Sequence, residues 1–304
     1  MIKASDTFDG RFPFQARFNG PDGRRVHYVD EGAGDPVLLL HGLPTWSFLY
    51  RDIIPLLSER NRVVAPDYLG FGKSDTPKDV EYTVSYHIDA LEALLLSLDL
   101  RDVTLVLHDW GGMMGTGLAL RHPDRIKRLV VMNTFMPLGR DIEQELLPQH
   151  NQRSNWFSWA DAAESRGDLS VMMENLDFNI LSLMQRAGLQ DLSAIDEHWV
   201  DAYARPFMGA CEGRAAYAFP RSIVRNTIAF EPPTEHSLNA ILSKPAMMIY
   251  GMKDKALLSE YMIPIFRDAF PNSPIYPLAN AGHYCQEDAP ETIGLLIRQF
   301  IDLT

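Results

Sequence analysis

The sequence lacks several features that would place a protein in a specialised class. Only two of its 304 residues are cysteines, Cys211 and Cys285, and their wide separation favours reduced thiols in a cytosol-like compartment over a disulfide framework. No apolar run approaches the roughly 18 residues that a membrane span needs. The N-terminus carries acidic residues and has no apolar core, which argues against a signal peptide. We therefore expect a soluble, cytoplasmic protein.

The chain also lacks an excess of basic residues. Its 28 lysines and arginines stand against 40 aspartates and glutamates, and the formal net charge of −12 argues against nucleic acid or an anionic membrane as a partner. Internal repeats and low-complexity segments are absent as well. A hydrophobic content of 46% and a charged content of 22% are ordinary for a globular enzyme, which we expect to be a monomer. No spacing of histidine, cysteine and acidic residues predicts a metal site or a cofactor: His122 and His150 are isolated, and Asp67 lies in a loop.

The most informative stretch is 103–112, which reads V-T-L-V-L-H-D-W-G-G. Its apolar, β-branched start predicts a strand buried on both faces, and the periodic residues 113–122 predict a helix after it. A polar residue on a sharp strand-to-helix turn is typical of a nucleophile elbow. The residue at the tip is Asp109 rather than serine, and Leu107 replaces the first glycine of the usual G-x-S-x-G pattern.

An aspartate at this position changes the chemistry that the turn supports. A serine that displaces a leaving group from a saturated carbon would form an ether, which water does not cleave. A carboxylate would form an ester, which water can hydrolyse to complete the turnover. Asp109 therefore indicates substitution at an sp3 carbon, as in alkyl halides or epoxides. The structural alternative is an aspartate that only caps the following helix.

Buried strands and helices alternate along most of the chain. Strands are predicted at 36–40, 63–66, 103–107, 126–132, 246–251 and 274–278, with helices at 48–57, 82–98, 113–122 and 287–303 and a further helix that contains 264–270. An antiparallel hairpin at 12–18 and 25–29 precedes them. This order predicts an α/β fold with a mostly parallel central sheet and helices on both faces.

A helical, aromatic segment interrupts this alternation between about residues 136 and 229. The strand pattern returns afterwards at 246–251. The simplest architecture is a core of residues 1–135 and 231–304, with a helical cap of residues 136–230 inserted before the last two strands.

Two further polar residues follow later strands, in the order that an elbow nucleophile requires. Asp254 comes after the strand at 246–251, and His283 comes after the strand ending near 278. Both positions are loops at the carboxyl ends of parallel strands, where α/β sheets gather their catalytic groups. We therefore expect Asp109, Asp254 and His283 to form a catalytic triad.

The loop His41-Gly42-Leu43-Pro44 follows the strand at 36–40 and is suited to an oxyanion hole. The backbone N–H groups of Leu43 and Trp110 are expected to point at a carboxylate oxygen of Asp109 and to stabilise the charge that develops during ester hydrolysis. The simpler interpretation is a plain tight turn.

With these residues in place, the chain resembles an α/β-hydrolase and, within that fold, a haloalkane dehalogenase, nearly from end to end. The motifs that carry the resemblance are H-G-L-P-T-W-S-F-L-Y-R at 41–51, D-Y-L-G-F-G-K-S-D at 67–75, H-D-W-G-G at 108–112, G-M-K-D-K at 251–255 and A-G-H-Y-C-Q-E-D at 281–288. In dehalogenases the tryptophan after the nucleophile holds the leaving halide, which matches Trp110.

The resemblance also indicates which branch of the family the chain follows. Leu43 stands where some branches place a halide-binding asparagine, and Asn133 stands where one branch places a catalytic glutamate. Both differences favour the branch with an Asp-His-Asp triad and two halide-binding tryptophans. The segment N-W-F-S-W-A-D at 155–161 resembles the cap region that supplies the second one, with Trp159 the better match and Trp156 the alternative. Both could instead be core aromatics. Expected pocket residues are Trp156, Phe157, Phe178, Phe207, Phe219 and Leu257.

The resemblance implies hydrolysis of small apolar haloalkanes to an alcohol and a halide ion, through an ester on Asp109 that water activated by His283 and Asp254 then cleaves. An epoxide hydrolase uses the same triad but needs two cap tyrosines, for which Tyr203 and Tyr217 are available. A relative acting on β-lactones and a non-catalytic small-molecule receptor are further alternatives. A dehalogenase of the fluoroacetate type would have an arginine where Trp110 stands.

Overall fold

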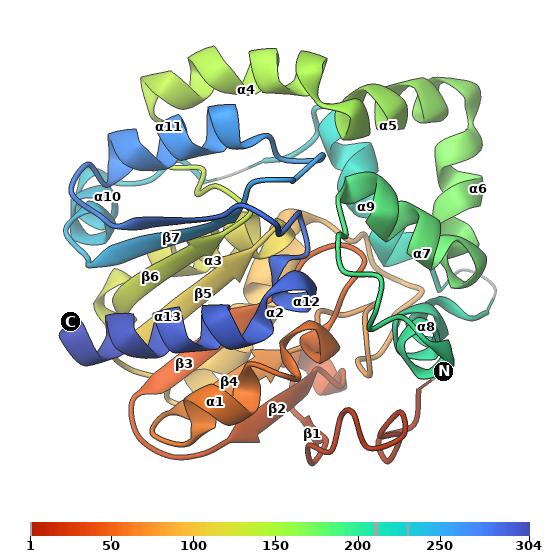
Figure 1. Cartoon of the computed structure of the whole chain (residues 1–304), viewed down its shortest axis with the longest axis horizontal. Helices are drawn as coiled ribbons and strands as arrows, with labels where there is room; N and C mark the ends of the chain where they lie inside the picture. The colour runs from red at the N-terminus through yellow and green to blue at the C-terminus, as the bar shows by residue number, and fades with distance from the viewer. Residues whose placement is uncertain (1, 210–211, 230) are drawn as a thin grey trace.

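A mixed sheet, mostly parallel, forms the centre of the molecule in the computed structural model, which describes residues 2–209, 212–229 and 231–304 (Figure 1). In the described residues the strand order is β1-β2-β4-β3-β5-β6-β7-β8. The strands are β1 (Arg17–Phe18), β2 (His27–Glu31), β3 (Pro36–Leu40), β4 (Arg62–Pro66), β5 (Val103–His108), β6 (Ile126–Met132), β7 (Ala246–Gly251) and β8 (Ile275–Leu278). Strand β2 pairs antiparallel with both β1 and β4, while β3 to β8 run parallel to one another, which confirms the predicted α/β architecture.

Helices cover both faces of this sheet (Figure 1). One group that packs together comprises α2 (Val84–Ser97), α3 (Trp110–Arg121) and α10 (Glu235–Leu242). The others are α1 (Ile54–Ser58), α11 (Ser259–Ala269), α12 (Cys285–Asp288) and α13 (Pro290–Leu303). The central strands β3, β5 and β7 are buried along their whole length, as expected for parallel strands with helices on both sides.

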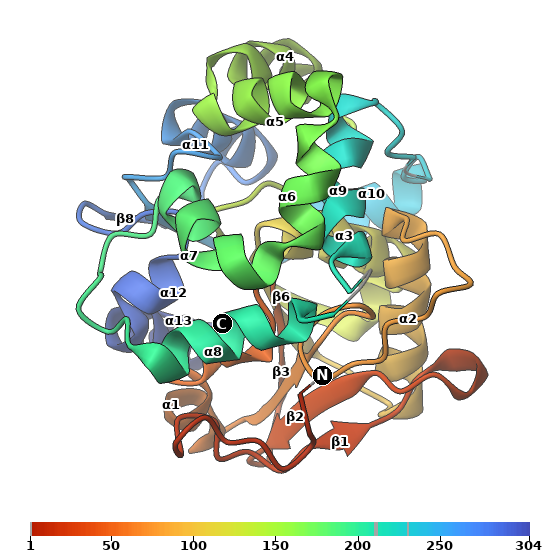
Figure 2. The same cartoon turned by 90° about the vertical axis from the view of Figure 1, so that its right-hand side faces the viewer.

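Among the described residues between β6 and α10, six α-helices form a layer over the carboxyl ends of the strands (Figures 1 and 2). They are α4 (Asp141–Arg153), α5 (Asn155–Arg166), α6 (Asp168–Glu174), α7 (Leu176–Ala187), α8 (Glu197–Ala204) and α9 (Arg214–Val224). We call them the cap. Residue 230, the proposed end of the cap, and Cys211 lie outside the described residues. Helix α10 packs on α3 and therefore belongs with the core helices.

Three of the predicted helices differ from the observed ones, and prolines explain two of the differences. The helix predicted at 48–57 is a 3₁₀ helix (Ser47–Tyr50) followed by α1, because Pro55 fits only the first turn of a helix. The helix predicted at 287–303 is split into α12 and α13 before Pro290 for the same reason. Helix α3 begins at Trp110, three residues earlier than predicted, because the turn at Asp109 leads directly into it.

A buried ionic cluster joins the cap to the core at α8. The two terminal guanidinium nitrogens of Arg51 donate to the two Glu287 carboxylate oxygens, at 2.5 and 2.8 Å. The same carboxylate accepts hydrogen bonds from Trp199 Nε1 at 2.9 Å and from the Tyr203 hydroxyl at 2.5 Å. Both oxygens of this buried acid have partners, and Arg51 is the cation among them, so removing Arg51 would leave an uncompensated buried charge.

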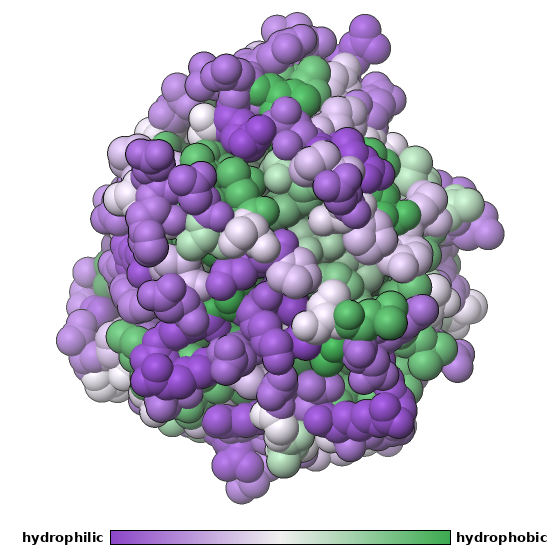
Figure 3. All heavy atoms as spheres, turned by 90° about the vertical axis from the view of Figure 1, so that its left-hand side faces the viewer, coloured by the Kyte–Doolittle hydropathy of each residue, from purple (hydrophilic) through white to green (hydrophobic). Residues whose placement is uncertain are grey.

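The polar and apolar side chains of the surface are mixed rather than segregated on the face drawn in Figure 3. Hydrophilic residues cover most of its rim, and apolar residues occur in patches between them. In the part of the chain that the structure describes, no helix has the length and apolar character needed to cross a membrane.

Leu107, at the position of the missing elbow glycine, is accommodated by another glycine. A Cβ at Gly115 on α3 would lie 2.2 Å from Leu107 Cδ2 and 3.0 Å from Leu40 Cδ1. Strand β5 can therefore carry a leucine at position 107 only because α3 has a glycine, with no side chain, at position 115.

This contact leads to a prediction about stability. We expect Gly115→Ala to lower the free energy of unfolding by about 1–3 kcal/mol through overpacking, as measured by urea denaturation. In the double variant with Leu107→Ala the extra methyl has room, so the combined loss should be smaller than the sum of the two single losses. Strictly additive losses, within about 0.5 kcal/mol, would contradict the proposed fit.

Candidate active site

The backbone at Asp109 has the geometry of a strained strand-to-helix turn. Its φ of 49° and ψ of −121° lie in a region that residues other than glycine rarely adopt. Strand β5 ends at His108 and α3 begins at Trp110, so Asp109 is the single residue of the turn. A Cβ at Gly111 would lie 2.4 Å from the Leu40 carbonyl oxygen, and this glycine therefore allows α3 to start close to β3.

The loop after β3 brings one backbone amide to the Asp109 carboxylate. The Leu43 N–H donates to Asp109 Oδ1 at 2.7 Å. A Cβ at Gly42 would lie only 2.2 Å from the same oxygen, so the close approach requires glycine there. The Trp110 amide, the second predicted donor, makes no hydrogen bond to this carboxylate in the described part of the chain.

His283 lies between two carboxylates. Its Nδ1 is 2.8 Å from Asp254 Oδ2, and its Nε2 is 3.4 Å from Asp109 Oδ2. An ionised carboxylate only accepts hydrogen bonds, so Nδ1 carries a proton and donates a hydrogen bond to Asp254. The three residues that the sequence places on separate loops are therefore neighbours in space.

Asp254 is held by hydrogen bonds to both of its oxygens. Oδ1 accepts from the backbone N–H groups of Ala256 and Leu257, each at 2.8 Å. Oδ2 accepts from Asn133 Nδ2 at 2.9 Å in addition to the imidazole. Asn133 follows β6, the neighbour of β7 in the sheet. It stands where one branch of the family would carry a glutamate, and here its amide group orients Asp254, which follows β7.

A second histidine fixes the backbone of His283. His108 Nε2 lies 2.8 Å from the His283 carbonyl oxygen, which makes this nitrogen the donor. Burial lowers the pKa of His108 to about 3, so it remains neutral. The histidine of the H-D-W motif thus has a structural explanation in the position of His283.

The electrostatics of the site favour a charged pair in the free protein. Burial alone would lower the pKa of His283, but the charges and hydrogen bonds of Asp254 and Asp109 outweigh it and raise this pKa to about 10. The pKa of Asp109 is lowered, because the contacts with His283 outweigh the effect of burial. At neutral pH the site therefore holds an imidazolium beside an ionised Asp109.

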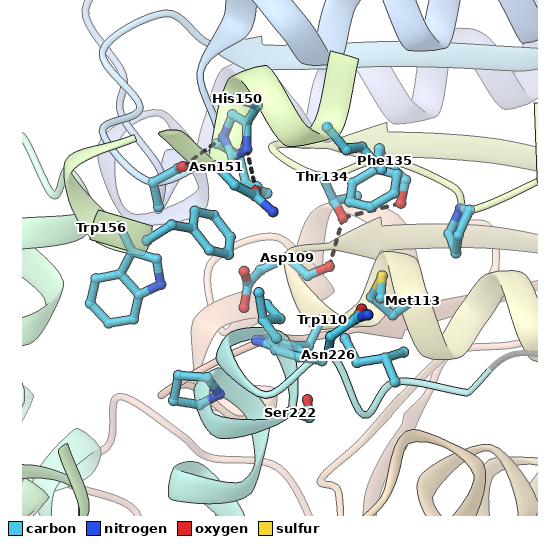
Figure 4. A pocket seen from close by; sticks show the side chains of 18 of the residues that line it. Asp109, Trp110, Met113, Thr134, Phe135, His150, Asn151, Trp156, Ser222 and Asn226 are labelled. Carbon is cyan, nitrogen blue, oxygen red and sulfur yellow. Dashed lines mark hydrogen bonds between the residues drawn. The ribbon is translucent and has the colours of Figure 1, made fainter. Parts of the chain in front are cut away.

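A cavity of about 470 Å³ opens beside the Asp109 carboxylate, between the sheet and the cap (Figure 4). Most of its wall is apolar, with a few polar groups. It is lined by Asp109, Trp110, Met113, Thr134, Phe135, Pro137, Leu147, Pro148, His150, Asn151, Trp156, Phe157, Pro220, Ser222, Ile223, Asn226, Ile228, Ala256 and Leu257. This combination of an apolar wall and few polar groups is typical of a small-molecule site.

Two tryptophans line this cavity on either side of Asp109. The ring of Trp110 stacks on Phe219, with centroids 4.5 Å apart and an angle of 18° between the planes. In Figure 4 the nitrogen-bearing edge of the Trp156 ring faces the side of the cavity where Asp109 lies. An indole N–H can only donate, so both rings suit an anion next to the carboxylate.

Trp159, the expected second halide donor, is not among the residues that line the cavity. It packs against Trp156 at a centroid distance of 5.2 Å, and the Arg186 guanidinium lies 4.9 Å from the centre of its ring. The cation–π contact with α7 accounts for its position. The structure thus places Trp156, the alternative candidate for the second halide donor, at the cavity.

The other expected pocket residues divide into three groups. Phe157 and Leu257 line the cavity together with Trp156. Phe207 and Phe219 are buried behind the cavity wall, where both pack on Phe71. The prediction for Phe178 was wrong: its side chain is 84% exposed on α7, because it lies on the outer face of an amphipathic helix.

Several residues of the cavity wall carried no usable pattern in the sequence. His150 on α4 has Nε2 3.0 Å from the Ala256 carbonyl oxygen, and Ser154 Oγ donates to the same oxygen at 2.7 Å. Thr134 follows directly after Asn133. These residues reach the site through the packing of the cap and of β6, which spacing along the chain does not reveal.

In the described part of the chain, no group of three or more His, Cys, Asp or Glu side chains could hold a metal ion.

Comparison with known proteins agrees with this geometry. A family model of the alpha/beta hydrolase fold matches residues 35–290. The chain is 33% identical over 297 residues to haloalkane dehalogenase 2 of Mycobacterium tuberculosis, covering 94% of each sequence. It is 31% identical over 306 residues to the cis-3-alkyl-4-alkyloxetan-2-one decarboxylase of Shewanella oneidensis, covering 97% of this chain and 91% of that protein.

Solved structures give the same picture. A mutant haloalkane dehalogenase from Agrobacterium tumefaciens superposes with a TM-score of 0.73 at 27% identity, covering 94% of this chain and 96% of that one. The chain therefore belongs to the α/β-hydrolase fold family, and within it to the haloalkane dehalogenase-like hydrolases.

The charged pair at the site predicts how stability depends on pH. The pKa of His283 is raised from its ordinary 6.5 to about 10, so its contribution to stability is fully present below pH 6.5 and is lost as pH rises through 10. Between pH 6.5 and 10 the free energy of unfolding of the wild-type protein should fall relative to that of a His283→Gln variant, by up to about 1.4 kcal/mol per pH unit. Parallel pH profiles of the two proteins in urea denaturation would contradict the charged pair.

Proposed function

We propose that the protein hydrolyses haloalkanes to alcohol and halide through a covalent ester on Asp109. The single observation that carries this proposal is a carboxylate, rather than a hydroxyl, on the strained turn between β5 and α3, within reach of a histidine–aspartate pair. Only an ester at this position can be both formed from an alkyl electrophile and cleaved again by water.

In the first step Asp109 attacks the halogen-bearing carbon in line with the carbon–halogen bond. The new bond joins carbon to a carboxylate oxygen, and the halide leaves with the bonding electron pair. The Leu43 N–H binds Oδ1, so Oδ2 is the oxygen left free of a backbone donor to attack. The departing anion would be held by the indole N–H groups of Trp110 and Trp156, which both border the cavity beside the carboxylate.

In the second step water cleaves the ester. Once the ester has removed the charge of Asp109, the imidazolium loses its Nε2 proton to solvent. His283 then accepts a proton from water at Nε2, and the water oxygen attacks the ester carbonyl carbon of Asp109. The Leu43 N–H then stabilises the negative charge on Oδ1 in the tetrahedral intermediate. When this intermediate collapses, the departing alkoxide oxygen takes the proton from His283 and leaves as the alcohol. The proton left on the Asp109 carboxyl returns to the imidazole, so the products over both steps are alcohol, halide and the one proton that His283 released after the first step.

The epoxide hydrolase alternative needs two tyrosine hydroxyls directed into the cavity. The Tyr203 hydroxyl instead donates to Glu287 within the buried cluster, and the Tyr217 hydroxyl donates to Glu164 at 3.0 Å. Neither residue is among those that line the cavity. These contacts argue against epoxide opening by a tyrosine pair.

A second candidate is favoured by one of the relatives. The Shewanella oneidensis protein is named for decarboxylation of a cis-3-alkyl-4-alkyloxetan-2-one, a β-lactone, and the similarity extends over nearly the whole of this chain. The same carboxylate nucleophile could attack a strained lactone, and the mostly apolar wall of the cavity suits alkyl groups. The two substrates release different products, halide or carbon dioxide.

The proposed mechanism predicts a trapped intermediate. We expect wild-type protein to release bromide continuously from 1-bromobutane, while His283→Phe releases one equivalent and stops. Mass spectrometry of this variant should show a butyl group on Asp109, because the ester forms but no base activates water.

The matched control is Asp109→Asn, which should release no bromide and carry no adduct. A His283→Phe protein without the adduct would rule out the ester mechanism for haloalkanes. If wild-type protein ignores a panel of haloalkanes but releases carbon dioxide from a cis-dialkyl β-lactone in an Asp109-dependent manner, the second candidate replaces the first.

The assignment of the halide donors gives a separate prediction. A hydrogen bond to an anion is worth about 1.5–3 kcal/mol, so Trp156→Phe and Trp110→Phe should each lower kcat/KM for 1-bromobutane about tenfold or more. Trp159→Phe on the same helix is the control and should change it less than about threefold, because that ring packs away from the cavity. A larger loss in Trp159→Phe than in Trp156→Phe would return the donor role to Trp159.

A further inference from the structure

Thr134 makes a hydrogen bond that links two neighbouring strand ends at the nucleophile. Its Oγ1 lies 2.6 Å from the backbone carbonyl oxygen of Asp109, and the residue is only 1% exposed. A carbonyl oxygen accepts, so the threonine hydroxyl is the donor. The contact joins the segment after β6 to the turn after β5.

The backbone that this bond restrains is the strained one. Asp109 has a φ of 49°, and its carbonyl oxygen accepts one further hydrogen bond, from the Gly112 N–H at 2.9 Å. Together the two donors fix the peptide plane that follows Asp109. Because the side chain departs from the same residue, the orientation of this plane helps to set the direction of the carboxylate.

The fit between Thr134 and the start of α3 is tight. A Cβ at Gly112 would lie 2.1 Å from Thr134 Oγ1 and 2.8 Å from its Cγ2. The glycine therefore leaves the space into which the threonine side chain enters. Thr134 also lines the cavity, but its one hydroxyl proton is already given to Asp109, so it is not available to a substrate.

We propose that Thr134 is a positioning residue for the nucleophile: its hydroxyl holds the Asp109 carbonyl and thereby fixes the angle at which the carboxylate meets the electrophilic carbon. This inference rests on the proposed function, because it assigns Thr134 to the first step, formation of the ester. Attack at a saturated carbon depends strongly on alignment, and a small displacement of the nucleophile slows it.

Two substitutions separate the hydroxyl from the rest of the side chain. Thr134→Val keeps the shape and removes the hydroxyl, whereas Thr134→Ser keeps the hydroxyl and removes the methyl. Each is placed in the His283→Phe protein, where the ester accumulates, and the rate constant of adduct formation on Asp109 is measured by mass spectrometry at increasing 1-bromobutane. Thermal unfolding of each variant accompanies the kinetics, and Thr134→Ala replaces the valine variant if that protein does not fold.

We expect the valine variant to form the ester about tenfold more slowly at saturating substrate, with half-saturation unchanged. The serine variant should stay within about threefold of its parent. In proteins that retain His283, the hydrolysis of the ester should be equally fast in the valine variant and in wild type, because the second step does not depend on the angle of attack by Asp109.

Three results would overturn the inference. Equal rates of ester formation in the valine variant and its parent would show that the hydroxyl does not align the carboxylate. Equal losses in the serine and valine variants would assign Thr134 to packing. A loss confined to hydrolysis would assign its oxygen to the attacking water. A fourth result, no adduct in the His283→Phe parent itself, would overturn the proposed function and this inference together, whereas an adduct that forms equally fast in the parent and in the valine variant overturns the inference alone.

Discussion

The placement of one carboxylate at the end of β5 determines how the surrounding structure is built. Asp109 is held with a positive φ, and its Oδ1 is bound to the Leu43 N–H at 2.7 Å. Such a conformation is unfavourable for a residue with a side chain and persists only where neighbours restrain it. Glycines at positions 42 and 112 allow the neighbouring loop and Thr134 to come close enough to do so.

The charges around His283 explain how a single imidazole could serve both steps of the proposed reaction. Between two carboxylates, its pKa is raised to about 10 and it stabilises the ionised nucleophile. Formation of the ester would remove the negative charge of Asp109 and leave only Asp254 beside the ring. The pKa of His283 must then fall, since one of its two anionic partners is lost. The imidazole would thereby become a base at the stage when water has to be activated.

The cap contributes more than a cover for the cavity, because several polar contacts fasten it to the core, among them one cluster at α8 and another at the end of α4. Glu287 collects hydrogen bonds from Trp199 and Tyr203 of α8 and from Arg51 of the core. At the other end of the cap, His150 and Ser154 bind the carbonyl of Ala256, whose own amide donates to Asp254. The position of the cap is thus linked through Ala256 to the loop that carries Asp254, the acid of the proposed mechanism.

The sequence by itself determined the sheet, the order of its strands along the chain and the three polar residues that meet at its edge. These follow from local patterns: apolar β-branched runs define the strands, and Asp109 directly follows β5, while Asp254 and His283 lie in the loops after β7 and β8. Because the carboxyl ends of parallel strands meet at one edge of a sheet, residues in these positions converge whatever the details of packing.

Only the tertiary structure decided which side chains of the cap face the cavity. Trp156 and Trp159 lie three residues apart on one helix, and their different environments depend on Arg186 of another helix. Phe178 is another aromatic residue of the cap, but its side chain lies at the surface. The hydroxyl groups of Tyr203 and Tyr217 donate to Glu287 and Glu164. The rotation of each cap helix is fixed by contacts with residues distant in the chain, and local sequence patterns carry no information about those contacts.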